Sequence, residues 1–370
     1  MNFKFSDNEK ILFQEMESVL TQEKQIFVHD ALHTEKEIAS ALITIKQKII
    51  SLGYMHAFSK ASPIGSVAAL EMMRIFAKHQ PSLFLGFEYG FRIFNEMRQW
   101  LTEPQIQSLH IDDSPTCAIA FCEDVVETDT KPSLLTVQSN GDHFLLSGEK
   151  RFVINAGIAK YFAVNGEIDN KSAIFFIPLQ SEGLEIHPLM NKRIFPGLAI
   201  ANIQFCNCMV SKSMVFFPQH INSLISHLQF FENIVCIACA LGMMDQCIEI
   251  TTGFAKTHQS ENKPLIAHQA VAFSLAEAVT LRQTAELLAY RAAWMFDSGD
   301  SEKNILNQCA KVFCSEAAET IASQCMNILG GQVFIDNHIV EQILCNSKFI
   351  QLIGISTHLA RIAIADVVLK

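Results

Sequence analysis

The sequence lacks the motifs of several common enzyme classes. It contains no GxSxG nucleophile elbow, no HExxH zinc helix, no GxxxxGK phosphate loop followed by Ser or Thr, and no GxGxxG dinucleotide fingerprint. Each of these motifs supplies a defined group at a defined place, such as a pair of zinc ligands or a backbone cradle for phosphates. Zincin, P-loop and nicotinamide-dependent chemistries therefore find little support in the residues.

Long apolar runs and paired cysteines are also scarce. The longest apolar run, Ile234–Met244, has eleven residues, whereas a bilayer-spanning helix needs about 20, so we expect a buried helix and no membrane span. Eleven cysteines include one CxxC pair, Cys236 and Cys239, without a second pair or a histidine at ligand spacing. We therefore expect no metal site and a reduced, cytoplasmic protein. The start, Met1–Gln14, lacks the features of an export signal.

Charge of one sign is in excess without being concentrated. Lys and Arg number 28 and Asp and Glu number 38, which gives a formal net charge of −10. Because the basic residues are dispersed, the chain offers no broad surface that could neutralise phosphates, and nucleic-acid binding is not expected. With 370 residues, 49% of them apolar, the chain is a globular protein of two or three domains and not a disordered or fibrous one.

The first third of the chain is predicted to be helical. Apolar residues recur at helical spacing over Glu9–Gln107, while strand-like alternation is scarce. The tripeptide 102–104 combines a capping threonine, an acidic residue and an early proline, which predicts one more short helix. The pattern ends at the polar stretch 112–115, so we place a helical domain at 1–113.

Short apolar runs follow, and they predict strands. Asn140 and Gly141 lie between two of these runs and form a strong hairpin signal. The expected strands are Cys117–Phe121, Leu134–Val137, Phe144–Leu146, Phe152–Ile154, Tyr161–Val164, Ala173–Pro178 and Ile200–Phe205. We therefore expect an antiparallel β domain over 114–217.

Long helical patterns return after about Asn222. The expected helices are Glu232–Phe254, Pro264–Phe296, Asn304–Leu329 and His338–Leu369. Their lengths and near-continuous apolar faces predict a four-helix bundle over 218–370. The faces exceed what four helices can hide from one another, so we expect a homodimer or homotetramer. The predicted fold class is a multidomain α+β protein with a helical N-terminal domain, an antiparallel β domain and a C-terminal bundle.

Glu232 is the most unusual ionisable residue, and its position allows two interpretations. It follows Phe230 and Phe231 and precedes Ile234 and Val235. Desolvation by such neighbours would make the carboxylate a stronger proton acceptor, as a general base requires. Alternatively, an acidic residue in the first turn of a helix complements the helix dipole, which is a purely structural role.

Three segments resemble the acyl-CoA dehydrogenase family. Residues 116–129 are similar to the family's flavin and substrate loop, T-E-P-x-x-G-S-D, and Gly148–Gly157 is similar to its G-x-K-x-W-I-T-N segment. Residues 325–348 contain Ile-Leu-Gly-Gly in place of the family's Q-I-L/H-G-G segment. With weaker matches in the last domain, the resemblance covers nearly all of the chain from Thr102 onward. The family's domain order, helical, β and helical, agrees with the order predicted from the residue patterns.

The resemblance implies an FAD-dependent oxidoreductase of fatty acid metabolism. Such an enzyme removes a proton and a hydride from the α and β carbons of an acyl-CoA or carrier-bound acyl thioester. An electron-transfer flavoprotein or a similar acceptor then reoxidises the flavin. The family's base is a Glu at one of two places, which fall here on Gly354 and Glu232. As in the isovaleryl-type branch, the resemblance therefore implies Glu232 as the base.

Further contacts are implied where the family's motifs match this sequence residue by residue. The implied substrate contacts are Thr128, Asn233 and Gly354. The implied FAD contacts are Phe121, Cys122, Thr128, Phe152, Val153, Ile154, Asn327, Gly331 and Ser356.

Several departures from the family's pattern imply that FAD is held weakly or lost. Phe152 and Ile154 stand where the family has a flavin-stacking Trp and a Thr that bonds the flavin N5 edge. His258 replaces the Arg that clamps the FAD pyrophosphate of a neighbouring subunit, and Glu127 adds a negative charge to the substrate loop. Two alternatives therefore stay open. One is a catalytically degenerate paralogue that acts in binding or assembly, and the other is a flavin monooxygenase of the same fold.

Overall fold

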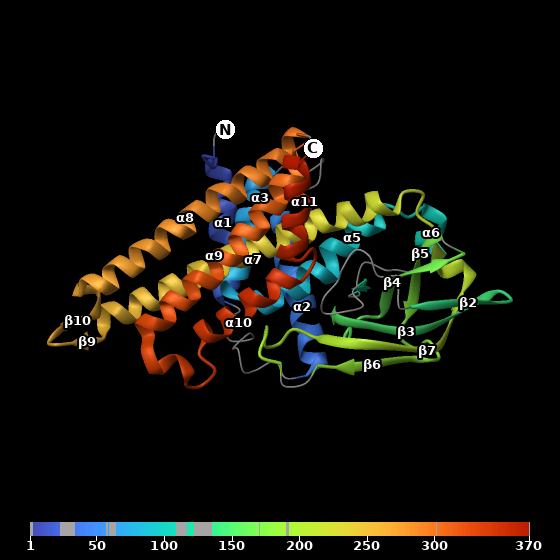
Figure 1. The fold of residues 1–370 in the computed structure, drawn as a ribbon, viewed down its shortest axis with the longest axis horizontal. Coiled ribbons are helices and arrows are strands. Elements are labelled where there is room, and N and C mark those ends of the chain that lie inside the picture. Colours follow the sequence, from blue (N-terminus) through green and yellow to red (C-terminus); the bar gives the residue numbers. More distant parts are fainter. Residues whose placement is uncertain are drawn as a thin grey trace.

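The two four-stranded sheets lie at one end of the molecule, and three long helices, α7 Ile221–Thr257, α8 Gln269–Ser298 and α9 Lys303–Leu329, extend away from them toward the other end (Figure 1). Helices precede and follow the strands along the chain, which confirms the predicted fold class. The domain boundaries at 113 and 217 stay predictions. The computed structural model describes residues 3–22, 34–56, 58, 64–108, 117–121, 135–169, 171–189, 192–300 and 302–369.

The N-terminal part is helical, as predicted. Helix α2 begins with a capping box, in which Thr34 and Glu37 satisfy each other's backbone amides. Between α4 and α5 the chain forms a π-helix, η4, a rare element that is frequent at functional sites. The elements are α1 Asp7–Gln22, α2 Glu35–Ile49, η2 Ile50–Leu52, η3 Tyr54–His56, α3 Ser66–His79, α4 Pro81–Phe87, η4 Glu88–Ile93, α5 Phe94–Arg98 and α6 Glu103–Ser108.

Two four-stranded sheets form the β region, with strand orders β1-β4-β5-β8 and β2-β3-β7-β6. Side chains from both sheets form a hydrophobic cluster, among them Phe144 and Phe175. Asn140 pairs with His143 across a tight turn in which Gly141 has φ +59°, so the predicted hairpin is confirmed. The strands are β1 Cys117–Ala120, β2 Thr136–Asn140, β3 His143–Ile154, β4 Tyr161–Ile168, β5 Lys171–Pro178, β6 Leu184–Pro188, β7 Ile200–Ser211 and β8 Val215–Phe216.

Three details of the predicted β domain are wrong. The expected strands Phe144–Leu146 and Phe152–Ile154 are parts of one strand, β3, because register shifts keep the intervening residues in the ladder with β7. β1 pairs with β4 in parallel, so the region is not purely antiparallel. β6 and β8 were not expected, since β6 is largely exposed and β8 has two residues.

The C-terminal part contains five helices among the described residues, and three predicted boundaries are wrong. The helix that was expected to begin at Glu232 begins at Ile221. Pro264 lies in a short strand, and the last predicted helix divides at 353–356, where Gly354 has φ +64°. The helices are α7 Ile221–Thr257, α8 Gln269–Ser298, α9 Lys303–Leu329, α10 Ile339–Leu352 and α11 Thr357–Leu369. Shorter elements are η5 Lys212–Met214, β9 Gln259–Ser260, β10 Lys263–Pro264, η6 Leu265–Ala267 and η7 Gly330–Phe334.

Helix α7 is the central helix of the hydrophobic core and packs against α3, α8 and α9. Within the described ranges it is long and apolar enough to cross a membrane, and 72% of its most apolar window is buried against other parts of the protein. The bent pair of α10 and α11 passes the same test of length and composition. Buried core helices meet this criterion too, and the predicted run Ile234–Met244 is indeed buried.

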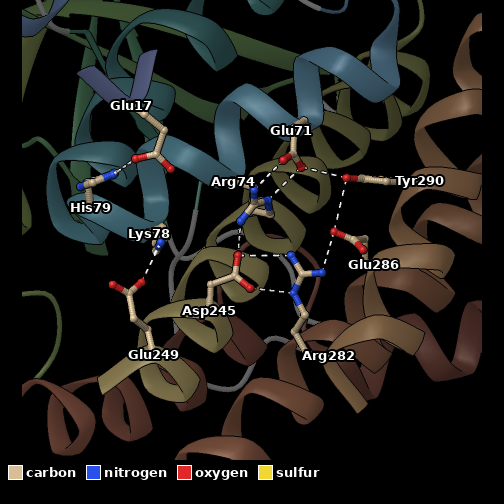
Figure 2. Close-up of polar contacts among 10 residues, drawn as sticks. All are labelled: Glu17, Glu71, Arg74, Lys78, His79, Asp245, Glu249, Arg282, Glu286 and Tyr290. Carbon is tan, nitrogen blue, oxygen red and sulfur yellow. Dashed lines mark hydrogen bonds and ion pairs between the residues drawn. The ribbon is translucent and has the colours of Figure 1, made fainter. Parts of the chain in front are cut away.

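A network of charged side chains joins α3, α7 and α8 (Figure 2). Asp245 of α7 accepts from Arg74 of α3 and from Arg282 of α8, with 2.6 Å between Arg282 Nε and Asp245 Oδ1. The Tyr290 hydroxyl donates to Glu71 at 2.8 Å. Because each charge meets an opposite charge, the network fixes α7 between its neighbours. We call the following six residues the Asp245 network: Glu71, Arg74, Asp245, Arg282, Glu286 and Tyr290.

Candidate active site

Glu232 lies inside α7 and not at its start. The helix begins at Ile221, eleven residues earlier. The structural interpretation of Glu232 as a first-turn residue is therefore wrong, because the helix dipole acts within the first turn. Phe231, Asn233 and Ile234 are buried, whereas Glu232 itself is half-buried. The carboxylate thus has apolar neighbours and retains some exposure.

Gly354 faces Glu232 from the turn between α10 and α11. A Cβ atom placed on Gly354 would lie 3.3 Å from both Cβ and Oε2 of Glu232. Gly354 also has φ +64°, a conformation that residues with side chains rarely adopt. The structure therefore brings together the two positions that the family resemblance singled out. A larger residue at 354 would be strained and would crowd the carboxylate.

Three further titratable groups surround Glu232. Burial raises the pKa of Tyr89 in η4 well above its usual range, and the charge of Glu232 raises it further. Burial also raises the pKa of Cys236, one turn along α7, to about 12, where Lys311 acts against the shift and Glu232 adds to it. Burial lowers the pKa of the Lys311 ammonium, while Cys236 and Glu232 raise it. Glu232 therefore shares its surroundings with a buried phenol, a thiol and an ammonium.

Asn233 and Ser356 lie next to this pair in the chain, but their side chains have other partners. Asn233 donates its amide to Oδ1 of Asn307 at 2.8 Å and is 2% exposed. Oγ of Ser356 accepts the backbone amide of Leu359 at 3.3 Å at the start of α11. The implied substrate contact of Asn233 and the implied FAD contact of Ser356 stay predictions.

The implied flavin contacts on β3 lie at a bulge. Phe152 has φ +51°, and its amide donates to Oδ1 of Asn202 at 3.1 Å. Its ring is half-buried, as is that of Phe121 directly after β1. The side chains of Val153 and Ile154 are buried. At the bulge, the Phe152 ring is therefore partly exposed at the edge of the core, and the two aliphatic side chains lie in the core.

Asn327 and Gly331 lie far from Glu232 along the helical part. Asn327 is sixteen residues beyond Lys311 on α9, which corresponds to about 24 Å of helix, and both Asn327 and Gly331 are exposed. His258 is exposed at the β9–β10 hairpin, with its ring stacked on Phe254. In Figure 1 this hairpin and the C-terminal end of α9 lie at the end of the molecule away from the sheets. Within one chain, the structure therefore does not bring Asn327, Gly331 or His258 close to Glu232.

Cys122, Glu127 and Thr128 lie outside the described residues, so their implied contacts stay predictions. Among the residues that the structure does describe, no group of three or more His, Cys, Asp or Glu side chains could hold a metal ion. The described cysteines are all free thiols.

Four residues near the site were missed by the sequence analysis. Lys311 and Asn307 are buried on α9, and Tyr89 is buried in η4. Asn346 of α10 accepts the backbone amide of Phe195 at 2.6 Å and so joins the bundle to the β region. One signal was available for Lys311, because it lies between Ala310 and Cys314 on an apolar helix face where a charge needs a specific partner.

The sequence is similar to a known family model and to characterised enzymes. A family model described as "Acyl-CoA dehydrogenase, C-terminal domain" matches residues 229–369. The 3-(aryl)acrylate reductase of Clostridium sporogenes is 24% identical over 296 residues, which cover 78% of this chain and 77% of that protein. The human mitochondrial short-chain specific acyl-CoA dehydrogenase is 25% identical over 297 residues, which cover 78% of this chain and 70% of that protein.

Solved structures share the whole fold. Butyryl-CoA dehydrogenase from Megasphaera elsdenii superposes with a TM-score of 0.86 at 17% identity, covering 100% of both chains. The FAD complex of PigA superposes with a TM-score of 0.83 at 17% identity, covering 100% of this chain and 99% of that chain. The matched family model, the sequence relatives and the shared fold agree: residues 229–369 match the C-terminal domain of acyl-CoA dehydrogenases, and the whole chain has the fold of these enzymes and resembles them at about 24% to 25% identity.

Proposed function

We propose that the protein is an FAD-dependent oxidoreductase that dehydrogenates an acyl thioester between its α and β carbons, with Glu232 as the general base. One observation carries this proposal. The Glu232 carboxylate faces Gly354, whose added Cβ would lie 3.3 Å from Oε2. These are the two positions at which the family resemblance locates a base. Position 232 carries a carboxylate here, and position 354 carries glycine, the residue that leaves this carboxylate the most room.

The proposed proton transfer is served by the surroundings of Glu232. An oxygen of the carboxylate accepts the α proton of the thioester. Because Glu232 is half-buried, its carboxylate is less hydrated than an exposed one, which favours it as a proton acceptor. The bare Cα of Gly354 leaves space for the substrate to approach. When bound, FAD supplies the acceptor for the hydride of the β carbon.

The β region fits an aromatic cofactor ring at the bulge of β3. Phe152 is held there in a left-handed conformation by the hydrogen bond that its backbone amide donates to Asn202. Bulges often orient side chains next to active sites. Phe152 and the backbone of Val153 and Ile154 would hold the isoalloxazine ring. The buried Ile154 offers no hydroxyl, so we propose that FAD is bound more weakly than is usual for the fold.

Assembly would complete the proposed FAD site. The β9–β10 hairpin and the C-terminal end of α9, which carry His258, Asn327 and Gly331, lie at the end of the molecule away from the sheets. A homodimer or homotetramer could bring that end to the β region of a neighbouring subunit. Exposed apolar side chains on α8, including Phe273 and Leu287, supply an apolar face for such an assembly. We propose an electron-transfer flavoprotein-like acceptor as the second partner, and the cytoplasm as the location.

The absorption spectrum of the purified protein tests this function. We expect a yellow protein, or one that becomes yellow on addition of FAD, and we expect acyl-CoA thioesters of some chain length to bleach the flavin without oxygen. A protein that stays colourless in excess FAD would indicate the degenerate paralogue. Oxygen uptake by the reduced flavoprotein, with no bleaching by any acyl-CoA, would indicate the monooxygenase.

A further inference from the structure

Helix α9 presents two buried polar side chains on one face. Asn307 and Lys311 are four residues apart, so they project from the same side of the helix, and they are 1% and 0% exposed. Burying an amide and an ammonium is unfavourable unless both are hydrogen-bonded. Their partners lie on two different segments, and these segments carry Glu232 and Gly354.

Asn307 binds α7 on both sides of Glu232. Its Oδ1 accepts from the side chain of Asn233 at 2.8 Å, and its Nδ2 donates to the carbonyl oxygen of Phe230 at 3.4 Å. The carbonyl of residue 230 and the side chain of residue 233 bracket Glu232. Asn307 therefore fixes the segment of α7 from which the carboxylate projects.

Lys311 binds the turn that contains Gly354. Its Nζ donates to the carbonyl oxygens of Gln351 and Ile353 at 3.3 Å each, and also to that of Ile355. An ammonium has three hydrogens to donate, and here three carbonyl oxygens receive them. The last two carbonyls flank Gly354. Lys311 therefore holds the turn in the conformation that gives Gly354 its positive φ.

The ammonium also acts on Glu232 electrostatically. Burial lowers the pKa of Lys311, and the nearby Cys236 and Glu232 partly restore it. Among the described residues, the Tyr89 phenol of η4 also lies close enough to Glu232 for the charge of Glu232 to raise its pKa. Since the bonds of Lys311 described here go to neutral carbonyls, its positive charge is not cancelled by them. It therefore favours the ionised form of Glu232.

We propose that Asn307 and Lys311 are positioning residues for the base: together they clamp Glu232 and Gly354 so that they face each other, and Lys311 favours the ionised carboxylate. This inference rests on the proposed function of Glu232. It predicts two separate local effects, one on the 353–357 turn from Lys311 and one on the 228–236 segment from Asn307.

Hydrogen exchange measured by mass spectrometry tests the clamp in the purified protein without any turnover. We expect Lys311→Met to speed amide exchange in 353–357 at least tenfold while 228–236 changes little, and Asn307→Ala to give the reverse pattern. Lys303→Met and Asn304→Ala are matched controls on the same helix, since Lys303 is half-buried and Asn304 is exposed. Unchanged exchange at both segments would overturn the clamp.

The charge effect is tested by the pH dependence of unfolding. The difference in unfolding free energy between the parent and Glu232→Gln reports the ionisation of Glu232. This difference changes with pH between the pKa of Glu232 in the unfolded state and its pKa in the folded state. We expect the folded-state pKa to rise by about one unit in Lys311→Met and to stay the same in Lys311→Arg. No movement in Lys311→Met would leave Lys311 as a structural residue and overturn its proposed action on the base.

Turnover separates this inference from the proposed function. If the flavin is bleached by a thioester, Lys311→Met should slow bleaching at least tenfold, with the acid limb of the rate profile shifted to higher pH, and Lys311→Arg should recover most of the rate. If wild type is not bleached by any acyl thioester while the exchange pattern is as expected, the proposed function fails and the clamp remains.

Discussion

Helix α7 carries two acidic side chains in buried surroundings, Glu232 and Asp245, and their neighbours differ. Asp245 is bound by the guanidinium groups of Arg74 and Arg282, which come from two other helices. Glu232 faces the bare Cα of Gly354, and the nearby ammonium of Lys311 donates to backbone carbonyls. Two guanidinium groups occupy the oxygens of Asp245, whereas a general base must be reachable and able to take a proton. Asp245 therefore serves stability, and Glu232 is suited to chemistry.

The largest effect on stability is expected from breaking the Asp245 network. Asp245→Ala leaves Arg74 and Arg282, whose side chains are 15% and 11% exposed, without their shared carboxylate. Removing one partner from a largely buried ion pair should lower the free energy of unfolding by roughly 3 kcal/mol. Urea unfolding at neutral pH measures this loss. Glu249→Ala is the control, because Glu249 lies one turn along α7, is 68% exposed and pairs with Lys78 at 2.8 Å (Figure 2). An exposed pair of this kind should contribute less than about 1 kcal/mol.

If Asp245→Ala and Glu249→Ala destabilise equally, the network is not what fixes α7. A loss of thioester-dependent bleaching in Asp245→Ala, measured at full folding and full FAD loading, would likewise remove the contrast between the two carboxylates.

A smaller effect is expected at the edge of the same network. The Tyr290 hydroxyl donates to Glu71 at 2.8 Å and also lies 3.3 Å from Oε1 of Glu286. Burial, followed by the charges of these two carboxylates, raises the pKa of Tyr290, so the hydroxyl stays a donor throughout the neutral range. Tyr290→Phe removes the donor but leaves every ion pair, and should cost about 1 to 2 kcal/mol in urea unfolding. A loss as large as that of Asp245→Ala would show that the hydroxyl, and not the ion pairs, dominates the network.

For the candidate site, the sequence was informative about positions that a motif identifies by residue type. It was less informative about features that arise from packing. Glu232 and Gly354 were found by their place in the family's motifs, although they are 122 positions apart. The break at 353–356 was missed because the apolar pattern of α10 continues into α11 without interruption. Its cause lies outside that segment, in the bonds from Lys311 to the carbonyls of the turn.

The start of α7 and the role of Asn307 show the same limit. The residues 221–231 mix polar and apolar side chains, and only packing against the rest of the protein extends the helix across them. Asparagine is usually a surface residue, yet Asn307 is 1% exposed. Its significance depends on Phe230 and Asn233, which are more than 70 positions away and which no local pattern connects to it.

The central claim is that Glu232 is the base, and the rate of thioester-dependent flavin bleaching in Glu232→Gln tests it most directly. The substitution keeps the shape of the side chain and removes the proton acceptor, so the rate should fall by roughly 10² to 10⁴. Glu249→Gln, an equivalent change on an exposed part of α7, should keep the wild-type rate. An unchanged bleaching rate in Glu232→Gln, at equal FAD content, would contradict the account.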